Sequence, residues 1–384
     1  MDARREFLLC FIIAALATAI YIAPALKKIG HWGDLEFIVQ LPTMAAQVDC
    51  IVKHGELPFW TPYEKGGVPV LANPKSMFLS PFFLLFLATD PIVGLKLRLF
   101  GHIVLALMSS YYLARYLGIN RAASALVAVL YSLNGRSCIH FAVGNFEHGQ
   151  HVFFPLVLYL YLRFVNERRN NLKFLLLGAA CCAWVSFDGA VYYYAYLYLL
   201  LGILTVAHLL FFQGTFLKAS SRRDLVSKFI IFVVASLALA SVKLLPSYAL
   251  LRKYPRPTVA PGIAGGAGYT SASMLHAFVN RNQQPRVIPG QRCETFPYLF
   301  FDHSEYWNWE EYGAYVGPLP FIVGASAFVY YARSRAELIV PALYLLSLTC
   351  SDRSWVFLHE FPIFCNMRGP ARFIILFLFC AVLL

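Results

Sequence analysis

The stretch VGLKLRLFGHIVLALMSSYYLAR at residues 93–115, followed after a short turn by RAASALVAVLYSLNGRSC at 121–138, decides the fold class. Each run is close to the roughly 20 residues that a helix needs to cross the hydrocarbon core of a bilayer. Arg115 and Arg121 stand at the two ends of the turn. Because hydrocarbon offers no partners to backbone N–H and C=O groups, the pattern predicts two consecutive transmembrane helices.

The rest of the chain repeats this pattern. The 384 residues are 59% hydrophobic and only 14% charged, whereas a soluble domain carries about a quarter charged residues. No soluble core accounts for that excess. We therefore predict an all-α polytopic membrane protein, a single bundle over residues 1–384 with about ten transmembrane helices. The expected spans are 7–26, 93–115, 121–138, 151–167, 172–187, 189–212, 228–247, 313–332, 336–350 and 369–384.

The distribution of basic residues predicts the orientation. The run Phe7–Leu26 is too long for a signal peptide and lacks the usual small-residue cleavage site, so we interpret it as a retained first helix. With the N-terminus in the cytoplasm, every cytoplasmic connection is short and basic. The formal net charge of +12 therefore indicates membrane topology, and we expect a lipid bilayer and no nucleic acid as partner. These connections carry Arg115, Arg121, Arg163, Arg168, Arg169, Lys173, Lys218, Arg222, Arg223, Lys228, Arg333 and Arg335.

Two long segments face the other side of the membrane in this topology, at 27–92 and 248–312. The apolar stretch Met77–Leu87 inside the first is too short to cross, so we expect a peripheral or re-entrant helix there. Loops of this length are usually functional. The last apolar run reaches Leu384 with no polar flank, as expected of a fragment of a longer chain.

The first outer loop holds two candidate carboxylates and an aromatic cluster. Asp34 and Glu36 stand in HWGDLE at 31–36. A partly desolvated carboxylate can act as a general base on a substrate hydroxyl, although a solvated loop pair is the plainer interpretation. Trp60 lies in GELPFWTPY at 55–63, and it is either an interfacial anchor or a stacking platform for a sugar ring.

Further ionisable residues stand at the outer mouths of predicted helices, where functional groups of membrane proteins gather. They are Glu147, His148 and His151 before the fourth span, and Asp188 between the fifth and sixth. A lone residue of this kind is often merely solvated. The two histidines and Glu147 could hold a divalent metal ion, but the ligand set is incomplete. We therefore assign no cofactor.

Two more candidates lie toward the C-terminus. Glu310 stands in WNWEEY at 307–312, just before a predicted span, and we expect it to contact substrate. Arg368 and Arg372 are four residues apart at the outer end of the last span, where the positive-inside rule predicts none. Such a pair suits a lipid phosphate, which guanidinium binds bidentately. Snorkelling toward headgroups explains it equally well.

The order of these features resembles the YfhO-type bacterial membrane proteins of the GT-C glycosyltransferase superfamily. The resemblance covers nearly the whole chain and rests on motifs that are individually weak. They are the Gly33-Asp34 dipeptide, the loop G-x-L-P-x-W-x-P from 55 that ends in Leu79-Ser-Pro81, His151 followed by PLVL at 155–158, YVGPLP at 315–320 and RGPARF at 368–373.

The resemblance implies an inverting transfer of a sugar from a polyprenyl-phosphate carrier to an acceptor outside the cytoplasmic membrane of a prokaryote. Asp34 matches the family's presumed general base, with Glu36 as substitute or helper. Glu147, His148 and Asp188 would line the cavity, while Arg368 and Arg372 would hold the carrier phosphate. Family members often have two adjacent acids in this loop, whereas here Leu35 separates them. A non-catalytic multi-pass subunit, transporter-like or a degenerate member of the superfamily, remains the alternative.

Overall fold

The computed structural model describes residues 3–27, 36–63, 66–142, 144, 146–167, 171–211, 217, 221–254, 269, 271–279, 313–331, 334–350, 353–361, 364 and 370–384. The regular secondary structure of this part of the chain is helical apart from one short hairpin, and the chain forms two compact units. The first unit contains residues 1–133, 143–194 and 219–255, and the second contains 134–142, 195–218 and 256–384. The single bundle expected over 1–384 stays a prediction.

The first unit is built around α5 (Pro91–Tyr116), which packs against α1, α3, α4, α6 and α8. The side chain of Asp90 starts this helix by accepting hydrogen bonds from the backbone N–H groups of Ile92 (2.8 Å) and Val93 (3.0 Å), and Pro91 fits the first turn. The other elements of this part of the unit are α1 (Ala3–Tyr21), α2 (Ala23–Lys27), α3 (Glu36–His54), α4 (Phe83–Ala88), α6 (Arg121–Ser132), the 3-10 helix η1 (Phe146–Phe153) and α8 (Phe154–Asn166).

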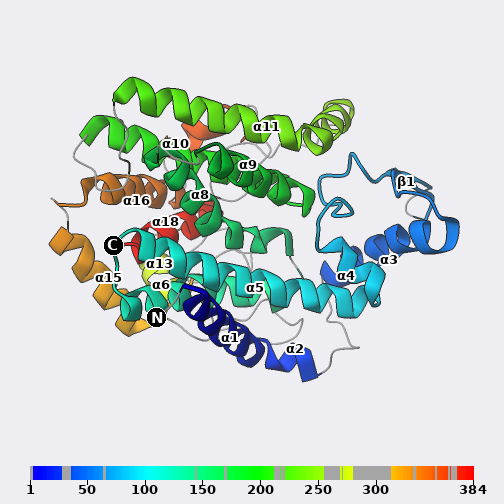
Figure 1. Ribbon diagram of the computed structural model, residues 1–384, viewed down its shortest axis with the longest axis horizontal. Coiled ribbons are helices and arrows are strands. Elements are labelled where there is room, and N and C mark those ends of the chain that lie inside the picture. Colours follow the sequence, from blue (N-terminus) through cyan, green and yellow to red (C-terminus); the bar gives the residue numbers. More distant parts are fainter. Residues whose placement is uncertain are drawn as a thin grey trace. The chain divides into compact units, whose positions relative to one another are not determined.

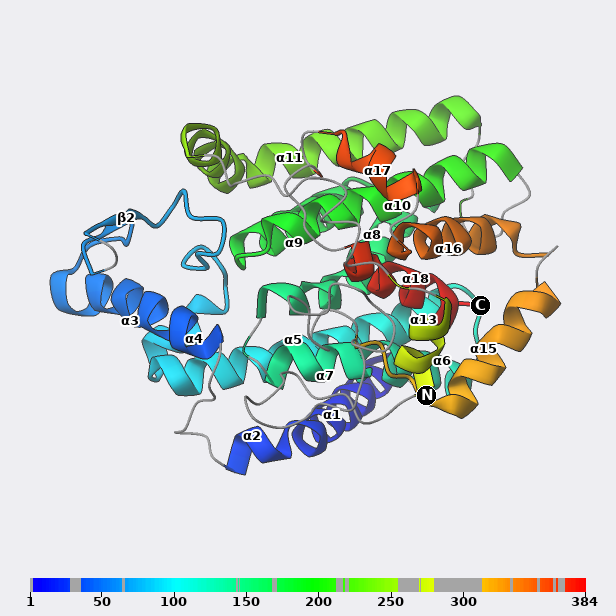
Figure 2. The ribbon, with the colours of Figure 1, turned by 180° about the vertical axis from the view of Figure 1, so that it is seen from behind.

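A second layer of this unit consists of α9 (Asn171–Phe187) and α11 (Arg222–Lys253), which lie side by side in both views (Figures 1 and 2). Helix α9 also packs on α8. The hairpin pairs β1 (Trp60–Thr61) with β2 (Val68–Pro69) in antiparallel register, with Trp60 opposite Pro69. The predicted short helix within Met77–Leu87 is present as α4, which has six residues.

The second unit contains α7 (Gly135–Ala142), most of α10 (Val191–Phe211), α13 (Ser271–Val279), α15 (Pro318–Tyr331), α16 (Ala336–Thr349), α17 (Arg353–His359), η3 (Pro370–Phe373) and α18 (Ile374–Val382). Helix α16 packs along α18 and η3. The core of this unit includes the fully buried Trp355 and Phe373, whose ring centroids are 5.7 Å apart.

Four helical segments of the described chain are long and apolar enough to cross a membrane. They are Pro91–Tyr116, Arg121–Ala142, Val191–Phe211 and Arg222–Lys253. Their length and composition indicate a multi-pass membrane protein, as predicted.

The expected number of about ten such helices is wrong for the described residues, because several of the predicted spans form helices that are too short or too charged. The run 151–167 divides into η1 and the 13-residue α8, which covers about 20 Å at 1.5 Å per residue. Helix α1 is long enough to cross, but its first turn carries three charged residues, Arg4, Arg5 and Glu6, so it does not count among these helices. Four more helical segments of the predicted spans are apolar but have fewer than 18 residues: Asn171–Phe187, Pro318–Tyr331, Ala336–Thr349 and Pro370–Val382.

Candidate functional site

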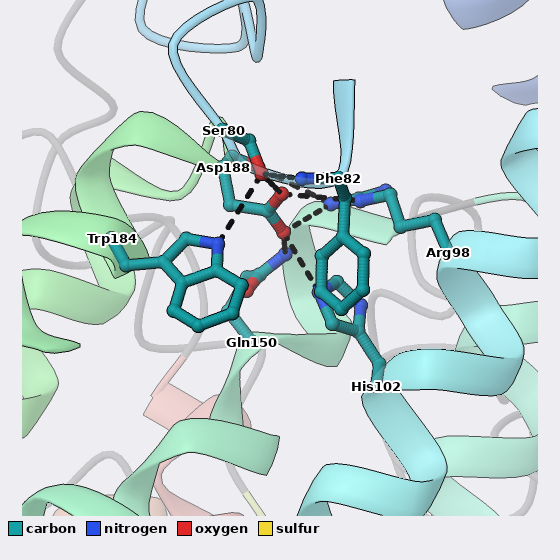
Figure 3. A network of polar contacts seen from close by, with 7 residues as sticks. All are labelled: Ser80, Phe82, Arg98, His102, Gln150, Trp184 and Asp188. Carbon is teal, nitrogen blue, oxygen red and sulfur yellow. Dashed lines mark hydrogen bonds and ion pairs between the residues drawn. The ribbon is translucent and has the colours of Figure 1, made fainter. Parts of the chain in front are cut away.

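A buried carboxylate, Asp188, binds polar side chains from three other parts of the first unit (Figure 3). It lies in the turn directly after α9. Arg98 and His102 reach it from α5, and their four-residue spacing places both on one face of that helix. Ser80, just before α4, and Gln150 of η1 complete the group, shown with Phe82 and Trp184 in Figure 3. Segments up to 108 residues apart in sequence therefore meet at one side chain.

Both carboxylate oxygens of Asp188 have close polar neighbours. Oδ1 accepts hydrogen bonds from the Ser80 hydroxyl at 2.6 Å and from Arg98 Nε at 3.3 Å. Oδ2 accepts from Arg98 Nη2 at 2.6 Å and from Gln150 Nε2 at 2.5 Å, and His102 Nε2 lies 3.0 Å away. Arg98 Nη2 also donates to the backbone carbonyl of Asp188 at 3.2 Å. Bidentate contact of this kind fixes position as well as charge.

Aromatic rings enclose the cluster. The His102 ring meets Phe82 edge to face, with centroids 4.7 Å apart, and Phe153 at 5.5 Å. The Trp184 ring lies 5.4 Å from Phe82, and its N–H donates to Ser80 Oγ at 3.3 Å. The side chains of Arg98, His102 and Asp188 have no exposed area. This low-polarity surrounding strengthens each charge interaction and excludes the solvated alternative for Asp188.

The ionisation of Asp188 follows from its neighbours. Burial by itself raises the pKa of this carboxyl, but the Arg98 guanidinium and the His102 imidazole outweigh burial and hold the pKa well below its ordinary value of 3.8. Asp188 is therefore a carboxylate at neutral pH. Since its oxygens already accept several hydrogen bonds, it is suited to anchoring α5, α9, η1 and the loop before α4, and not to taking a proton from a substrate.

Gly189 makes this turn possible. Its φ of +83° belongs to the left-handed region that glycine tolerates, and a Cβ atom there would lie 2.5 Å from the backbone oxygen of Lys75. We expect Gly189→Ala to lower the free energy of unfolding by roughly 2–4 kcal/mol, because strain and a backbone clash combine. Gly118→Ala is the matched control: its φ is +85° but its Cβ would meet nothing within 4 Å. Thermal unfolding in detergent compares them, and equal losses would exclude the clash.

The predicted site residues lie in different parts of the described chain. Trp60, in β1, is 56% exposed, and its ring packs so closely on Gly67 that a Cβ there would be 2.3 Å from Trp60 Cζ2. His151 is buried in η1 of the same unit, with its ring centroid 5.8 Å from that of Tyr131. Arg372 is half-buried in η3, in the second unit.

The side chains of the other predicted site residues are not described by the structure. Glu36 is the first residue of α3, and Glu147 and His148 belong to η1, but their side chains lie outside the described part of the molecule. Asp34, Glu310 and Arg368 lie outside the described residues altogether. Their assignments stay predictions.

Among the predicted residues whose side chains the structure describes, Asp188 alone belongs to the buried cluster, and its partners were not predicted. The sequence holds one feature that could have indicated Arg98 and His102 as site residues: they are two basic residues, four apart, within an apolar run. A buried guanidinium in a membrane helix pairs with other polar groups of the bundle, and an acidic side chain is one such partner. The sequence does not show which acid supplies it, because Asp188 lies 90 residues further along the chain.

No metal centre is visible in this part of the chain: among the described residues, no three or more His, Cys, Asp or Glu side chains gather as ligands. The suggested group of Glu147, His148 and His151 is not tested, since two of its side chains are not described. Comparison with known proteins gives no match to a family model and none to a curated protein.

Proposed function

We propose that this chain is a YfhO-like membrane glycosyltransferase that moves a sugar from a polyprenyl-phosphate carrier to an acceptor on the outer face of a prokaryotic cytoplasmic membrane, with its N-terminus in the cytoplasm. The acceptor hydroxyl oxygen attacks the anomeric carbon from the side opposite the phosphate and gives its proton to Asp34. The bond between the anomeric carbon and the phosphate oxygen breaks, which inverts the configuration and releases the carrier phosphate. Arg368 and Arg372 hold that phosphate.

One observation supports this proposal most: the first outer loop is tied to the helices by the Asp188 cluster. Ser80, close to the end of this loop, donates to Asp188 Oδ1 at 2.6 Å, and Asp188 is held by Arg98 of α5. General-base catalysis depends on holding the base and the reacting atoms in a fixed geometry. A loop that carries catalytic groups has to be held in place, and the hydrogen bond from Ser80 to the buried Asp188 holds this one.

This interpretation gives Asp188 and Trp60 separate roles. Asp188 positions the loop, because its oxygens already accept hydrogen bonds from Ser80, Arg98 and Gln150. Trp60 presents an exposed indole that is held against Gly67. A fixed aromatic ring offers a flat apolar surface to the C–H face of a sugar.

A non-catalytic subunit is the second candidate, and the same cluster favours it in one respect. Asp188 is the predicted acidic residue whose side chain the structure describes, and it is engaged in holding the fold. Fold and function are separable, so a glycosyltransferase-like bundle can persist without activity. Only an assay of turnover distinguishes the two.

The assay uses purified protein in nanodiscs, a polyprenyl-phosphate sugar with a radiolabel in the sugar, and membrane acceptors. We expect turnover, and we expect Arg368→Ala and Arg372→Ala each to raise the KM for the carrier by about 10- to 100-fold, the effect of losing one charged hydrogen bond. Arg223→Ala is the control, because Arg223 is exposed near the start of α11 and lies on the cytoplasmic side in the proposed topology. Carrier binding without turnover supports the non-catalytic subunit, and an unchanged KM in both variants contradicts the phosphate site.

A further inference from the structure

Lys243 is a charged residue buried inside the apolar run of α11. Its ammonium donates hydrogen bonds to two backbone carbonyls of the first outer loop, Asn73 O at 2.6 Å and Ser76 O at 3.1 Å. Removing an ammonium from water is costly unless its N–H groups find acceptors. These two contacts therefore fasten the Asn73–Ser76 turn to a long helix.

The Asn73–Ser76 turn is closed by hydrogen bonds of its own and contacts two further elements. It is closed by Ser76 N–H donating to Asn73 O (3.0 Å) and by Lys75 N–H donating to Asn73 Oδ1 (3.0 Å). The Ser76 hydroxyl donates to Gln47 Oε1 on α3, at 3.4 Å between buried side chains. The Lys75 carbonyl packs against Gly189. The turn thus connects α11, α3 and the turn that carries Asp188.

Helix α3 is the element that brings this connection to the proposed chemistry. It begins at Glu36, two residues after Asp34, and Gln47 lies within it. Gln47 and Glu36 belong to the same helix, so we expect a change in how α3 is held at Gln47 to shift its first turn as well. We propose that Lys243 is a positioning residue of the transferase, which acts through the Asn73–Ser76 turn and α3 on the general base. This inference rests on the proposed function.

Kinetics of Lys243→Met test the positioning role. Methionine keeps an unbranched apolar side chain and removes the charge and the donors. We expect kcat per folded molecule to fall about 10- to 100-fold, the cost of misplacing a catalytic group, with less than about threefold change in the KM for the carrier. Lys243→Arg, which keeps donors and charge, recovers part of kcat.

The matched control is Lys228→Met on the same helix. Lys228 also donates to a backbone carbonyl, Val165 O at 2.9 Å, but that carbonyl belongs to α8 and not to the outer loop. This variant keeps kcat and KM. A purely structural role of Lys243 would lower the amount of folded protein and leave kcat per folded molecule unchanged.

A second readout does not depend on turnover. Cys50 is buried on α3, three residues after Gln47, and its labelling by a maleimide, followed by peptide mass spectrometry, reports how firmly α3 is held. We expect about a tenfold faster labelling in Lys243→Met, the effect of losing a buried hydrogen bond, and no change in Lys228→Met.

The two readouts separate the proposals. Faster labelling in a protein that shows no turnover means that the fastening exists and the proposed function is wrong. Unchanged labelling of Cys50 in Lys243→Met would show that Lys243 does not hold α3 in place. Faster labelling with unchanged kcat in an active protein overturns the positioning role.

Discussion

Replacement of Asp188 by asparagine is expected to lower the free energy of unfolding by about 3–5 kcal/mol, the usual cost of removing one partner of a buried ion pair. The carboxamide has the same shape as the carboxylate but no charge. It leaves the Arg98 guanidinium buried without its counter-ion, although the two bind at 2.6 Å in the wild type. Because Ser80, Gln150 and His102 also lose a charged partner, we expect α5, α9, η1 and the segment before α4 to separate together.

Thermal unfolding in detergent, followed by size-exclusion chromatography, measures this loss. The control is Asp49→Asn, the same chemical change in an ion pair with Lys53. That pair is of similar length, 2.7 Å, but its side chains are exposed, Lys53 to 63% and Asp49 to 37%. Exposed pairs contribute about 0–1 kcal/mol. The double variant Asp188→Asn with Arg98→Met removes both charges and is expected to be more stable than Asp188→Asn alone. A loss no larger than that of Asp49→Asn would show that the pair does not hold the fold.

The same experiment has a defined pH dependence. Since Arg98 and His102 hold the pKa of Asp188 below its ordinary value of 3.8, the ionised carboxylate stabilises the fold at every pH above that value. This stabilisation is lost as the pH falls through the lower pKa of the folded state. The difference between wild type and Asp188→Asn is therefore expected to stay constant from neutral pH to about pH 4 and to shrink only in stronger acid.

The helices were predictable where an apolar run and a start signal coincide. The predicted span 93–115 corresponds to α5 at Pro91–Tyr116, because Asp90 and Pro91 mark its start and the run is unbroken. The predicted span 228–247 is shorter than the helix it corresponds to, α11 at Arg222–Lys253. Its charged ends, from Arg222 and up to Lys253, continue the helix although they are not apolar. Hydropathy measures the part of a helix that suits lipid, and the hydrogen-bonded helix extends beyond it.

The site was predictable only as separate residues. Asp188 stood out as an ionisable group at a helix mouth, but nothing near it in sequence indicates that Arg98 and His102 bind it. Such pairing is a product of packing among α5, α9 and η1, and local patterns do not contain it. Lys243 and the Asn73–Ser76 turn are a further example, since backbone carbonyls are present in every residue and only the fold selects two of them.

Substitution of the proposed base is expected to have the largest effect on activity. Asp34→Asn removes the group that accepts the proton of the acceptor hydroxyl and should lower kcat by about 10²- to 10⁴-fold, the range in which general-base catalysis contributes. The amide keeps the shape and the hydrogen-bonding capacity of the side chain, so the KM for the carrier should change little. Single-turnover measurements with the labelled carrier separate this chemical step from product release.

Glu36→Gln is the matched control, because it makes the same chemical change two residues further on, at the first residue of α3. If Asp34 is the base and Glu36 only assists, Glu36→Gln lowers kcat by less than about tenfold, and the wild-type loss of rate at low pH disappears in Asp34→Asn alone. The reverse result would assign the base to Glu36, and the proton would then be accepted by a residue on α3 itself. Equal and small effects from both variants in an active protein would mean that neither carboxylate takes the proton. In that case the loop held by Asp188 and Lys243 would serve to bind substrate, and its Trp60 ring, not its acids, would be the group to replace next.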